Sequence, residues 1–361
     1  MKIFFDYKIF FQQEYGGPSN YFVNLVRELN VLKCNAKIFA PIHINLHLQK
    51  SNNIFFNFNF FIKKNFFIKY LNFINFIFTK FFMHFFRPQI YHTTYYGYNI
   101  NRSRIPMVVT VYDLIHEIYS KTYYKKLLST NFKKKILEKS QHIICISKNT
   151  QKDLIKYYNV NIEKTSVVYL GKYEDNTLLN NQNIFKPFFL YVGNRHRYKN
   201  FKILLKAYSQ SKILMENVDL ICFGGGNFTE EEKNSMFNYQ IPFNNIIHLE
   251  GEDKILVELY QKAVALIYPS LYEGFGIPLV DAMHQGCPLI VSRKSCFPEI
   301  CQNSALYFDP LSINDLINMM NTILFNKKIR NNLIVLGKER ANYFSWHKCA
   351  KETLNIYKNI V

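Results

Sequence analysis

The feature that most constrains the fold is an alternation of short apolar runs with amphipathic stretches, which occurs in both halves of the chain. The apolar runs are rich in β-branched and aromatic residues, as strands buried in a parallel sheet are. In the first half they read KIFFDYK (2–8), AKIFAPI (36–42), IYHTTYY (90–96), MVVTVYD (107–113), HIICIS (142–147) and SVVYLG (166–171). In the second half they read FFLYVGN (188–194), VDLICFGGG (218–226), IIHLEGE (246–252), VALIYPS (264–270), CPLIVS (287–292) and ALYFDP (305–310).

Several stretches between these runs have helical periodicity: SNYFVNLVRELNVL (19–32), KNTQKDLIKYY (148–158), NFKILLKAYSQS (200–211) and DKILVELYQKA (253–263). Strands that alternate with helices predict an α/β fold with parallel sheets. We expect two Rossmann-like domains, at 1–172 and 188–361, whose sheets face each other across a cleft. A polar, Asn-rich linker covers 173–187, and the last helix belongs either to the second domain or packs back on the first. Ligands of such sheets bind at the carboxyl ends of the strands.

Composition indicates which cellular compartment and which kinds of binding partner to expect. The net charge of +19 comes from scattered lysines without a nucleic-acid motif, so we expect phosphorylated ligands or an anionic membrane surface and no nucleic acid. Seven cysteines without a C-x-x-C pair predict reduced thiols in a cytoplasmic protein, with Cys145 and Cys222 in the core. The N-terminus lacks the pattern of a signal peptide because Asp6 interrupts its apolar run, and no apolar run is long enough to predict a membrane span.

One segment, residues 66–86, interrupts the alternation with the apolar periodicity of an amphipathic helix. Its apolar positions are Phe67, Tyr70, Leu71, Ile74, Ile77, Phe78, Phe81, Phe82 and Phe85, and lysines and Arg87 surround it. A helix that packs on the first domain's core is one interpretation. An interfacial helix on an anionic bilayer is the other.

The stretch YPSLYEGFGIPLVDAMHQG (268–286) follows a predicted strand and carries two carboxylates around a glycine turn. Gly274 and Gly276 allow the backbone to approach a ligand closely, and Pro278 suits the first turn of a helix. A helix that begins after a glycine turn favours an anion, whereas Glu273 and Asp281 would accept hydrogen bonds from hydroxyls. A nucleotide-sugar, with hydroxyls on both sides of a diphosphate, has this layout.

This stretch resembles the E-x7-E signature of retaining glycosyltransferases of family 4, which have the GT-B fold. The resemblance implies that Glu273 contacts the donor sugar and that Asp281, in place of the usual second Glu, holds the ribose. It also implies that the backbone at Phe275, Gly276 and Ile277 orients the donor sugar.

YVGNRHRYKN (191–200) is similar to the segment in which that family holds the donor diphosphate with two cations, here Arg195 and Lys199. Arg197 is an alternative cation. Arginine binds phosphate as a planar fork and lysine as a point charge. ICFGGG (221–226) is similar to the family's glycine turn near the nucleotide, which places Gly224 and Gly225 beside the donor.

In the first domain, YGGPSNYF (15–22) resembles the family's Gly-Gly loop, which contacts donor and acceptor through Gly16 and Gly17, and Ser19 is the expected N-cap of the following helix. VYDLIHE (111–117) resembles the segment in which the family often has a histidine near the reacting carbon. Here Tyr112 has that position, with Asp113 and His116 nearby as further candidates. His92 is another cleft candidate, although a structural role is more common for a lone histidine.

The resemblance covers nearly the whole chain and implies a glycosyltransferase similar to mannosyltransferases of bacterial surface polysaccharide assembly. The reaction would move a hexose from GDP-mannose or a UDP-sugar to a glycan or lipid-linked acceptor in lipopolysaccharide, O-antigen or capsule biosynthesis. No metal-ligand pattern stands out, so we expect no metal and no cofactor besides the donor. The enzyme would be cytoplasmic, or peripheral on the inner face of the cytoplasmic membrane. A sugar-nucleotide epimerase of the same architecture and a non-catalytic nucleotide-sugar or membrane-binding module are the alternatives.

Overall fold

The computed structural model describes residues 1–51, 60–61, 68–97, 105–119, 128–173 and 186–361. It divides into two compact units, Met1–Gly171 with Ser345–Val361 and Lys172–Phe344. We expected the last helix either to belong to the second domain or to pack back on the first. The last seventeen residues belong to the first unit, because their helix packs on a helix near the N-terminus. Most of the expected linker, 174–185, lies outside the described residues.

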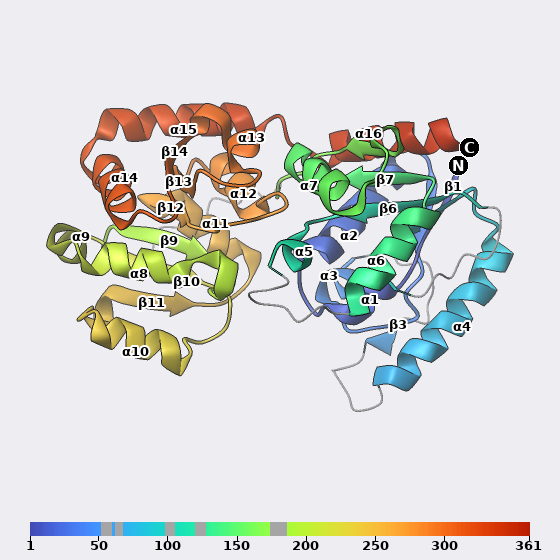
Figure 1. Cartoon of the computed structure of the whole chain (residues 1–361), viewed down its shortest axis with the longest axis horizontal. Helices are drawn as coiled ribbons and strands as arrows, with labels where there is room; N and C mark the ends of the chain where they lie inside the picture. Colours follow the sequence, from blue (N-terminus) through green and yellow to red (C-terminus); the bar gives the residue numbers. More distant parts are fainter. Residues whose placement is uncertain (52–59, 62–67, 98–104, 120–127, 174–185) are drawn as a thin grey trace. The chain divides into compact units, whose positions relative to one another are not determined.

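The first unit contains a six-stranded parallel sheet in the order β2-β1-β5-β6-β7-β8 (Figure 1). Its strands are β1 (Lys2–Phe5), β2 (Asn35–Ile38), β5 (Ile90–Thr93), β6 (Met107–Val111), β7 (His142–Cys145) and β8 (Thr165–Val167). The chain runs outward from β1 to β2 and then returns to build the sheet on the other side of β1. The order therefore reverses between β1 and β5, and the crevice at that reversal is where such sheets bind ligands.

The second unit has a six-stranded parallel sheet in the order β11-β10-β9-β12-β13-β14, the strand order of a dinucleotide-binding Rossmann fold. Its strands are β9 (Phe188–Val192), β10 (Asp219–Phe223), β11 (Ile246–Leu249), β12 (Ala265–Tyr268), β13 (Leu289–Ser292) and β14 (Ala305–Phe308). The order reverses between β9 and β12. All twelve strands of the two large sheets lie within, or overlap, the apolar runs from which they were predicted.

The helices of the first unit are α1 (Lys8–Gln12), α2 (Gly17–Val31), α3 (Leu46–Gln49), α4 (Ile68–Phe86), α5 (Ile115–Ile118), α6 (Leu128–Lys139), α7 (Lys148–Tyr158) and α16 (Trp346–Ile360). Those of the second are α8 (Phe201–Ser209), α9 (Lys212–Asn217), α10 (Glu230–Asn238), α11 (Asp253–Lys262), α12 (Ile277–His284), α13 (Phe297–Cys301), α14 (Ile313–Phe325) and α15 (Lys327–Ala341).

Local signals explain several helix boundaries. Ser147 caps α7 as its side chain accepts from the N–H of Thr150, and Thr229 and Glu232 form a capping box at α10. The expected cap at Ser19 was wrong. Helix α2 begins earlier, at Gly17, because Pro18 suits its first turn, and the Ser19 hydroxyl donates to the Gly16 carbonyl.

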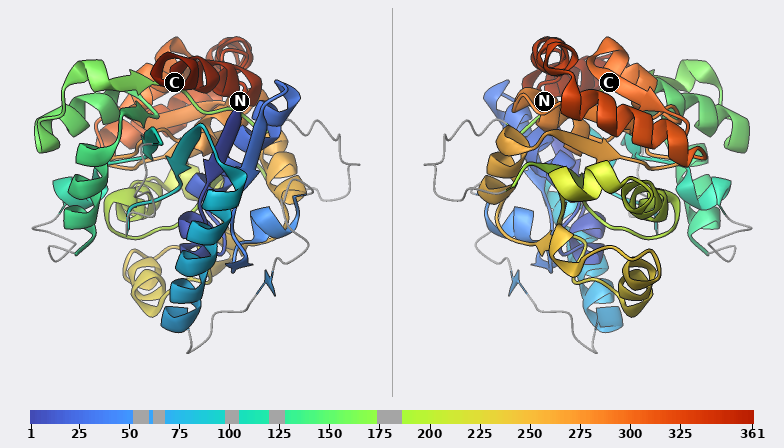
Figure 2. Two further views of the ribbon diagram at one scale, coloured as in Figure 1. Left: turned by 90° about the vertical axis from the view of Figure 1, so that its right-hand side faces the viewer. Right: turned by 90° about the vertical axis from the view of Figure 1, so that its left-hand side faces the viewer.

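The core of the second unit lies between its sheet and the helices α8, α9 and α14, with large buried side chains such as Phe189, Tyr208 and Leu220. In the first unit α16 packs along α2, and Tyr357 of α16 is fully buried. A small two-stranded sheet, β3 (Ile42–His43) with β4 (Phe60–Phe61), was not predicted. Helix α4 lies on the outside of the first unit, nearest the viewer in the left panel of Figure 2.

Candidate functional site

The loops that follow β9 and β12 meet at the point where the second sheet reverses its strand order. The N–H of Leu271 donates to the Tyr198 carbonyl at 2.7 Å. The Asn200 side chain donates to the carbonyl oxygens of Pro269 and Pro310 at 3.3 and 3.0 Å. These bonds fix the two loops to each other, so the side chains they carry have defined positions.

An ion pair between Lys199 and Glu273 joins these loops at a distance of 2.7 Å. Both side chains are mostly buried, with 16% and 12% of their surfaces exposed. Burial alone would lower the pKa of Lys199, but the Glu273 carboxylate and the neighbouring Tyr268 and Tyr198 outweigh it, so that pKa lies well above its usual range. Lys199 is therefore a fixed cation at the reversal point, where an anionic ligand of this fold would bind.

Glu273 is held from the other side by Ser295. The backbone N–H of Glu273 donates to the Ser295 hydroxyl, and that hydroxyl donates to the Glu273 carbonyl, at 3.1 and 2.5 Å. The backbone of the catalytic candidate is thus fixed, and its carboxylate points to Lys199.

Arg195, which we expected to hold the donor diphosphate together with Lys199, is surrounded by hydrogen-bond acceptors of the protein itself. Its guanidinium is buried and donates to the Glu232 carboxylate and to the carbonyls of Gly224, Gly226 and Asn227, at 2.9, 2.9, 2.5 and 3.1 Å. Four hydrogen bonds to protein groups occupy most of the donors of an arginine. Arg195 therefore holds the glycine turn after β10 in shape, and the structure brings Lys199, not Arg195, to Glu273.

The glycine turn itself requires glycine. Gly224, Gly225 and Gly226 all have positive φ, between 74° and 77°. A Cβ on Gly225 would lie 2.6 Å from the carbonyl oxygen of Gly193, which directly follows β9. The turn is therefore in close contact with the loop that follows β9, and this loop carries Lys199. Gly224 and Gly225, the two glycines expected beside the donor, both lie in the turn. Arg197, the alternative cation, has an exposed side chain in the loop that carries Lys199.

Helix α12 follows Glu273 after a turn in which Gly276 has φ 91° and serves as N-cap. Ile277 begins the helix and Pro278 follows it, as the sequence predicted. The Phe275 side chain is buried against Phe344, with ring centroids 5.6 Å apart, so only its backbone could face a ligand.

Asp281 is the fifth helical residue of α12, just beyond its first turn. One carboxylate oxygen accepts from the backbone N–H of Tyr173 at 2.8 Å. Burial raises the pKa of Asp281 to about 7, and nearby Asp253 adds to the effect, whereas the bond from Tyr173 opposes it. The protonation state of Asp281 therefore changes near neutral pH.

In the first unit, Gly16 and Gly17 form the start of α2, after α1, and Tyr112 follows β6. Tyr112 is buried against Tyr21, its hydroxyl donates to the Thr94 carbonyl at 3.4 Å, and burial raises its pKa well above the usual range. It can donate a hydrogen bond but cannot act as a base at neutral pH.

Asp113 and His116 lie just after Tyr112, where the sequence placed them. One carboxylate oxygen of Asp113 accepts from the N–H of Ile115 at 3.1 Å, and Lys133 donates to the Asp113 carbonyl at 2.8 Å. Burial raises the pKa of Asp113, and Lys133 opposes that shift. His116 begins the short helix α5 with Ile115.

His92 is a structural residue. Its ring nitrogens pair with the hydroxyls of Tyr357 and Thr110 at 2.5 and 3.0 Å, and burial lowers its pKa to about 3.

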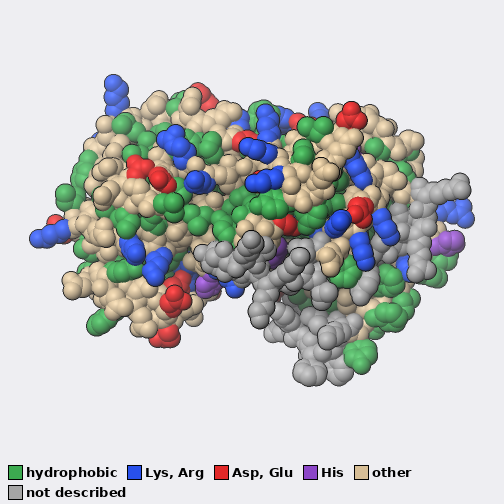
Figure 3. All heavy atoms as spheres, viewed as in Figure 1, with side chains coloured by type: hydrophobic (Ala, Val, Ile, Leu, Met, Phe, Trp, Pro, Cys, Tyr) green, Lys and Arg blue, Asp and Glu red, His purple; other side chains and the backbone are tan. Residues whose placement is uncertain are grey.

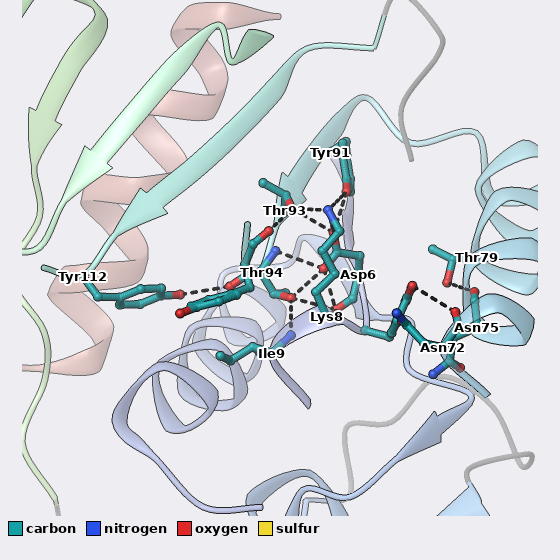
Figure 4. A network of polar contacts seen from close by, with 12 residues as sticks. Asp6, Lys8, Ile9, Asn72, Asn75, Thr79, Tyr91, Thr93, Thr94 and Tyr112 are labelled. Atoms are coloured by element: carbon teal, nitrogen blue, oxygen red, sulfur yellow. Dashed lines mark hydrogen bonds and ion pairs between the residues drawn. The ribbon is translucent and has the colours of Figure 1, made fainter. Parts of the chain in front are cut away.

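A buried polar network that we did not predict occupies the reversal point of the first sheet (Figure 4). Asp6 follows β1 and pairs with Lys8 at 3.2 Å. Its carboxylate also accepts from the hydroxyls of Tyr91, Thr93 and Thr94 at 2.5, 2.9 and 2.5 Å. Burial alone would raise the pKa of Asp6, but Lys8 and these hydrogen bonds outweigh it and hold that pKa below the usual range. A charged residue directly after one strand and a Thr-Thr pair at the end of another were the signals available in the sequence.

Among the described residues no three or more His, Cys, Asp or Glu side chains gather in a way that could hold a metal ion. In the same part of the chain, no helix is both long and apolar enough to cross a membrane. The seven cysteines are free thiols, and Cys145 and Cys222 are buried as predicted.

Residues 15–171 match the family model described as Glycosyltransferase Family 4, and residues 177–340 match the model described as Glycosyl transferases group 1. The chain is 29% identical over 212 residues to the O-antigen chain mannosyltransferase RfbU of Salmonella typhimurium. It is 25% identical over 234 residues to the O-antigen chain mannosyltransferase B of Escherichia coli. These matches cover 56% and 62% of this chain, and 56% and 61% of the two relatives, so the chain spans less than two thirds of each relative's length.

The solved structure of HepE from Anabaena, in complex with UDP and glucose, superposes with a TM-score of 0.76 at 15% identity and covers 99% of both chains. Two successive Rossmann-like units with this likeness define a protein of the GT-B fold. Within that class the chain belongs to the glycosyltransferases that combine a Family 4 first half with a group 1 second half, and O-antigen mannosyltransferases are among its relatives.

Proposed function

We propose that the protein is a retaining glycosyltransferase that moves a hexose, with mannose as the first candidate, from a nucleoside diphosphate sugar to a glycan or lipid-linked acceptor. The observation that carries this proposal is the Lys199–Glu273 pair at the reversal point of the second sheet. A fixed cation and a carboxylate side by side suit a ligand with a diphosphate next to sugar hydroxyls.

Each group would act at a different part of the donor. Lys199 would neutralise the diphosphate as it leaves, and the N-terminus of α12 would add a favourable dipole. Glu273, released from Lys199 by the incoming phosphates, would accept hydrogen bonds from the donor sugar. The carboxylate oxygen of Asp281 that does not bind Tyr173 would accept from the ribose.

The glycine turn after β10 would support the site indirectly. Arg195 and Glu232 hold this turn, and the turn contacts the Gly193 backbone before the Lys199 loop. We therefore assign Arg195 a positioning role and Lys199 the contact with phosphate. In the first unit, Gly16, Gly17 and the groups at Tyr112 and Asp113 remain our candidates for the acceptor side.

The donor's identity rests on the relatives. RfbU and the Escherichia coli protein are named as mannosyltransferases of the O-antigen chain, which favours GDP-mannose. HepE was solved with UDP and glucose, which makes a UDP-sugar the second candidate. The acceptor would then be a growing surface glycan on a lipid carrier, and the enzyme would work without a metal at the cytoplasmic face of a membrane.

A donor screen tests the proposal. Purified protein is mixed with each common nucleoside diphosphate sugar, and thermal stabilisation and released nucleotide are measured. We expect one donor to stabilise the protein, Lys199→Ala to lose that stabilisation, and Glu273→Ala to lose turnover by about 10²–10³-fold.

The control is Lys262→Ala, which removes a lysine from an i,i+4 pair on α11 and should leave donor binding unchanged. A folded protein that responds to no donor would contradict the assignment and favour a non-catalytic module. Conversion of the donor to its epimer without an acceptor would identify an epimerase instead.

A further inference from the structure

Helix α4 exposes its apolar side. Seven large apolar residues on it are between 37% and 73% exposed: Tyr70, Phe73, Ile74, Ile77, Phe78, Phe81 and Phe85. Their spacing of three and four residues puts them on one side of the helix, and we name this set the α4 stripe. Hydrophobic side chains gather at the lower right of Figure 3, where Figure 1 shows α4. A stripe of this size on a soluble surface marks an interaction site.

The side of α4 that faces the first unit is partly polar, the reverse of an ordinary surface helix. Asn75 is buried, and its side chain accepts from the Ile42 N–H at 3.0 Å and donates to the Ile42 carbonyl at 2.8 Å. The buried Thr79 hydroxyl donates to the Asn75 carbonyl, and the Tyr7 hydroxyl donates to the carbonyl of Asn72 (Figure 4). Turning the helix to bury its stripe would break these bonds, so the outward orientation is fixed.

The C-terminal half of α4 is anchored by aromatic contacts. Phe82 packs on Phe39 with ring centroids 4.3 Å apart. The ammonium groups of Lys2 and Lys37 each lie 5.8 Å from the Phe86 ring centroid. Two positive charges therefore lie at the C-terminal end of α4, next to Phe86.

The charge of this region is one-sided. No Asp or Glu occurs between Glu28 and Asp113, a segment that includes all of α4. The basic residues in the same segment are Lys33, Lys37, Lys50, Lys63, Lys64, Lys69, Lys80, Arg87, Arg102 and Arg104. An aromatic stripe in a segment of the sequence that carries basic residues and no acid complements a surface that is apolar beneath and anionic above.

We propose that the α4 stripe docks this protein on an anionic lipid surface, with the helix lying in the plane of the interface. At about 1.5 Å per residue, its 19 residues would lie along roughly 28 Å of bilayer surface. A second copy of the chain is a poorer occupant, because a two-fold interface through this stripe would bring two positively charged borders together.

Flotation with liposomes tests the proposal. The full chain is mixed with vesicles of phosphatidylcholine alone or with about 30% phosphatidylglycerol. We expect flotation with the anionic vesicles that weakens as salt rises, since exposed charges are screened. In the double variant Phe78→Asp/Phe81→Asp we expect binding to fall about tenfold or more, because two rings that would enter the bilayer are replaced by anions.

The matched control is Phe237→Asp/Leu311→Asp, which places two aspartates on exposed apolar positions of the second unit. This variant should float as the wild type does. Donor stabilisation should be unchanged in both variants, so failure of lipid binding is distinguishable from failure of the proposed activity. A folded stripe variant that still floats would overturn the proposal. So would a wild type that does not float but forms a dimer lost in the stripe variant.

Discussion

At the scale of single residues, two cations that look equivalent in the sequence have different surroundings. Arg195 donates four hydrogen bonds to the glycine turn and Glu232, whereas Lys199 contacts a carboxylate at the sheet's reversal point. A ligand phosphate could draw Lys199 from Glu273 by exchanging one anion for another. It could reach Arg195 only by breaking the turn that supports the site.

The first prediction separates these two roles. We expect Arg195→Lys to lower the free energy of unfolding by about 2–4 kcal/mol, because lysine cannot replace the planar set of bonds and leaves buried acceptors unpaired. Its kcat/KM should fall less than that of Lys199→Met, because Arg195 acts on the site only through the turn. Lys199→Met should instead lower kcat/KM by about 10²-fold or more with a smaller loss of stability. Chemical unfolding and steady-state kinetics on both variants check this. An Arg195→Lys protein of normal stability with no donor binding would show that Arg195 contacts the phosphates.

A second residue-scale prediction concerns pH. The pKa of Asp281 is raised by burial to about 7, so the folded state keeps a proton that the unfolded state loses near pH 4. Its contribution to stability is present at low pH and is lost as pH rises through 7. Asp281→Asn should remove this loss.

We therefore expect the unfolding midpoint of Asp281→Asn, relative to wild type, to rise between pH 5 and pH 8. Because part of the Asp281 surface is exposed, the change should be on the order of 1 kcal/mol, or about 2–4 °C for the unfolding of the second unit, Lys172–Phe344. The same difference at both pH values would mean that the carboxylate is not buried in solution.

The sequence indicated which residues belong to the candidate site but not which of them contact each other. Glu273 and Lys199 were predicted from motifs after two strands, and the structure pairs them. The hydrogen bonds of Arg195 could not be predicted, because three of its four acceptors are backbone carbonyls whose directions depend on the three-dimensional shape of the turn. The Asp6 network joins residues 85 or more positions apart, which no local pattern reports.

At the scale of elements, the glycine turn after β10 offers a matched pair of substitutions. Both Gly225 and Gly226 have a positive φ. An alanine methyl group at 225 would lie 2.6 Å from the Gly193 carbonyl oxygen, whereas one at 226 would meet no atom within 4 Å. We expect Gly226→Ala to lower the free energy of unfolding by about 1 kcal/mol and Gly225→Ala to lower it by at least 2 kcal/mol more. Gly225→Ala should also weaken donor binding, because the loop that carries Lys199 must shift. Thermal unfolding and donor titration check this. Equal costs would mean that the turn and the β9 loop are not in contact.

The elements themselves were largely predictable because buried parallel strands need continuous runs of Ile, Val and Phe, and turns must interrupt them. The pair β3 and β4 was missed, since each strand has two residues and its pairing joins Ile42 to Phe60 across an intervening segment. The periodicity of α4 was correct, but periodicity alone does not say which side is buried. That depends on Asn75, which finds its partner in β3.

At the scale of the whole molecule, the first unit is completed by α16. Trp346 lies against Gly171, where an added Cβ would meet its ring, and Tyr357 pairs with His92 in the core. We expect removal of residues 345–361 to expose the apolar side of α2 and to make the first unit, but not residues 188–344, sensitive to limited proteolysis. Peptide mapping by mass spectrometry checks this, with removal of residues 360–361 alone as the control. A protease-resistant first unit in the longer truncation would contradict the assignment of α16.

The place of α16 also bears on how the protein is made. Helix α2 leaves the ribosome early, yet α16, the helix that covers it, is synthesised some three hundred residues later. At roughly 5–20 residues per second, the nascent first unit would keep the apolar side of α2 uncovered for about 10–35 seconds while residues 172–344 of the second unit are synthesised. The first unit can therefore complete its core only after the whole second unit has been made, and a chaperone would be needed most by the part of the chain that is made first.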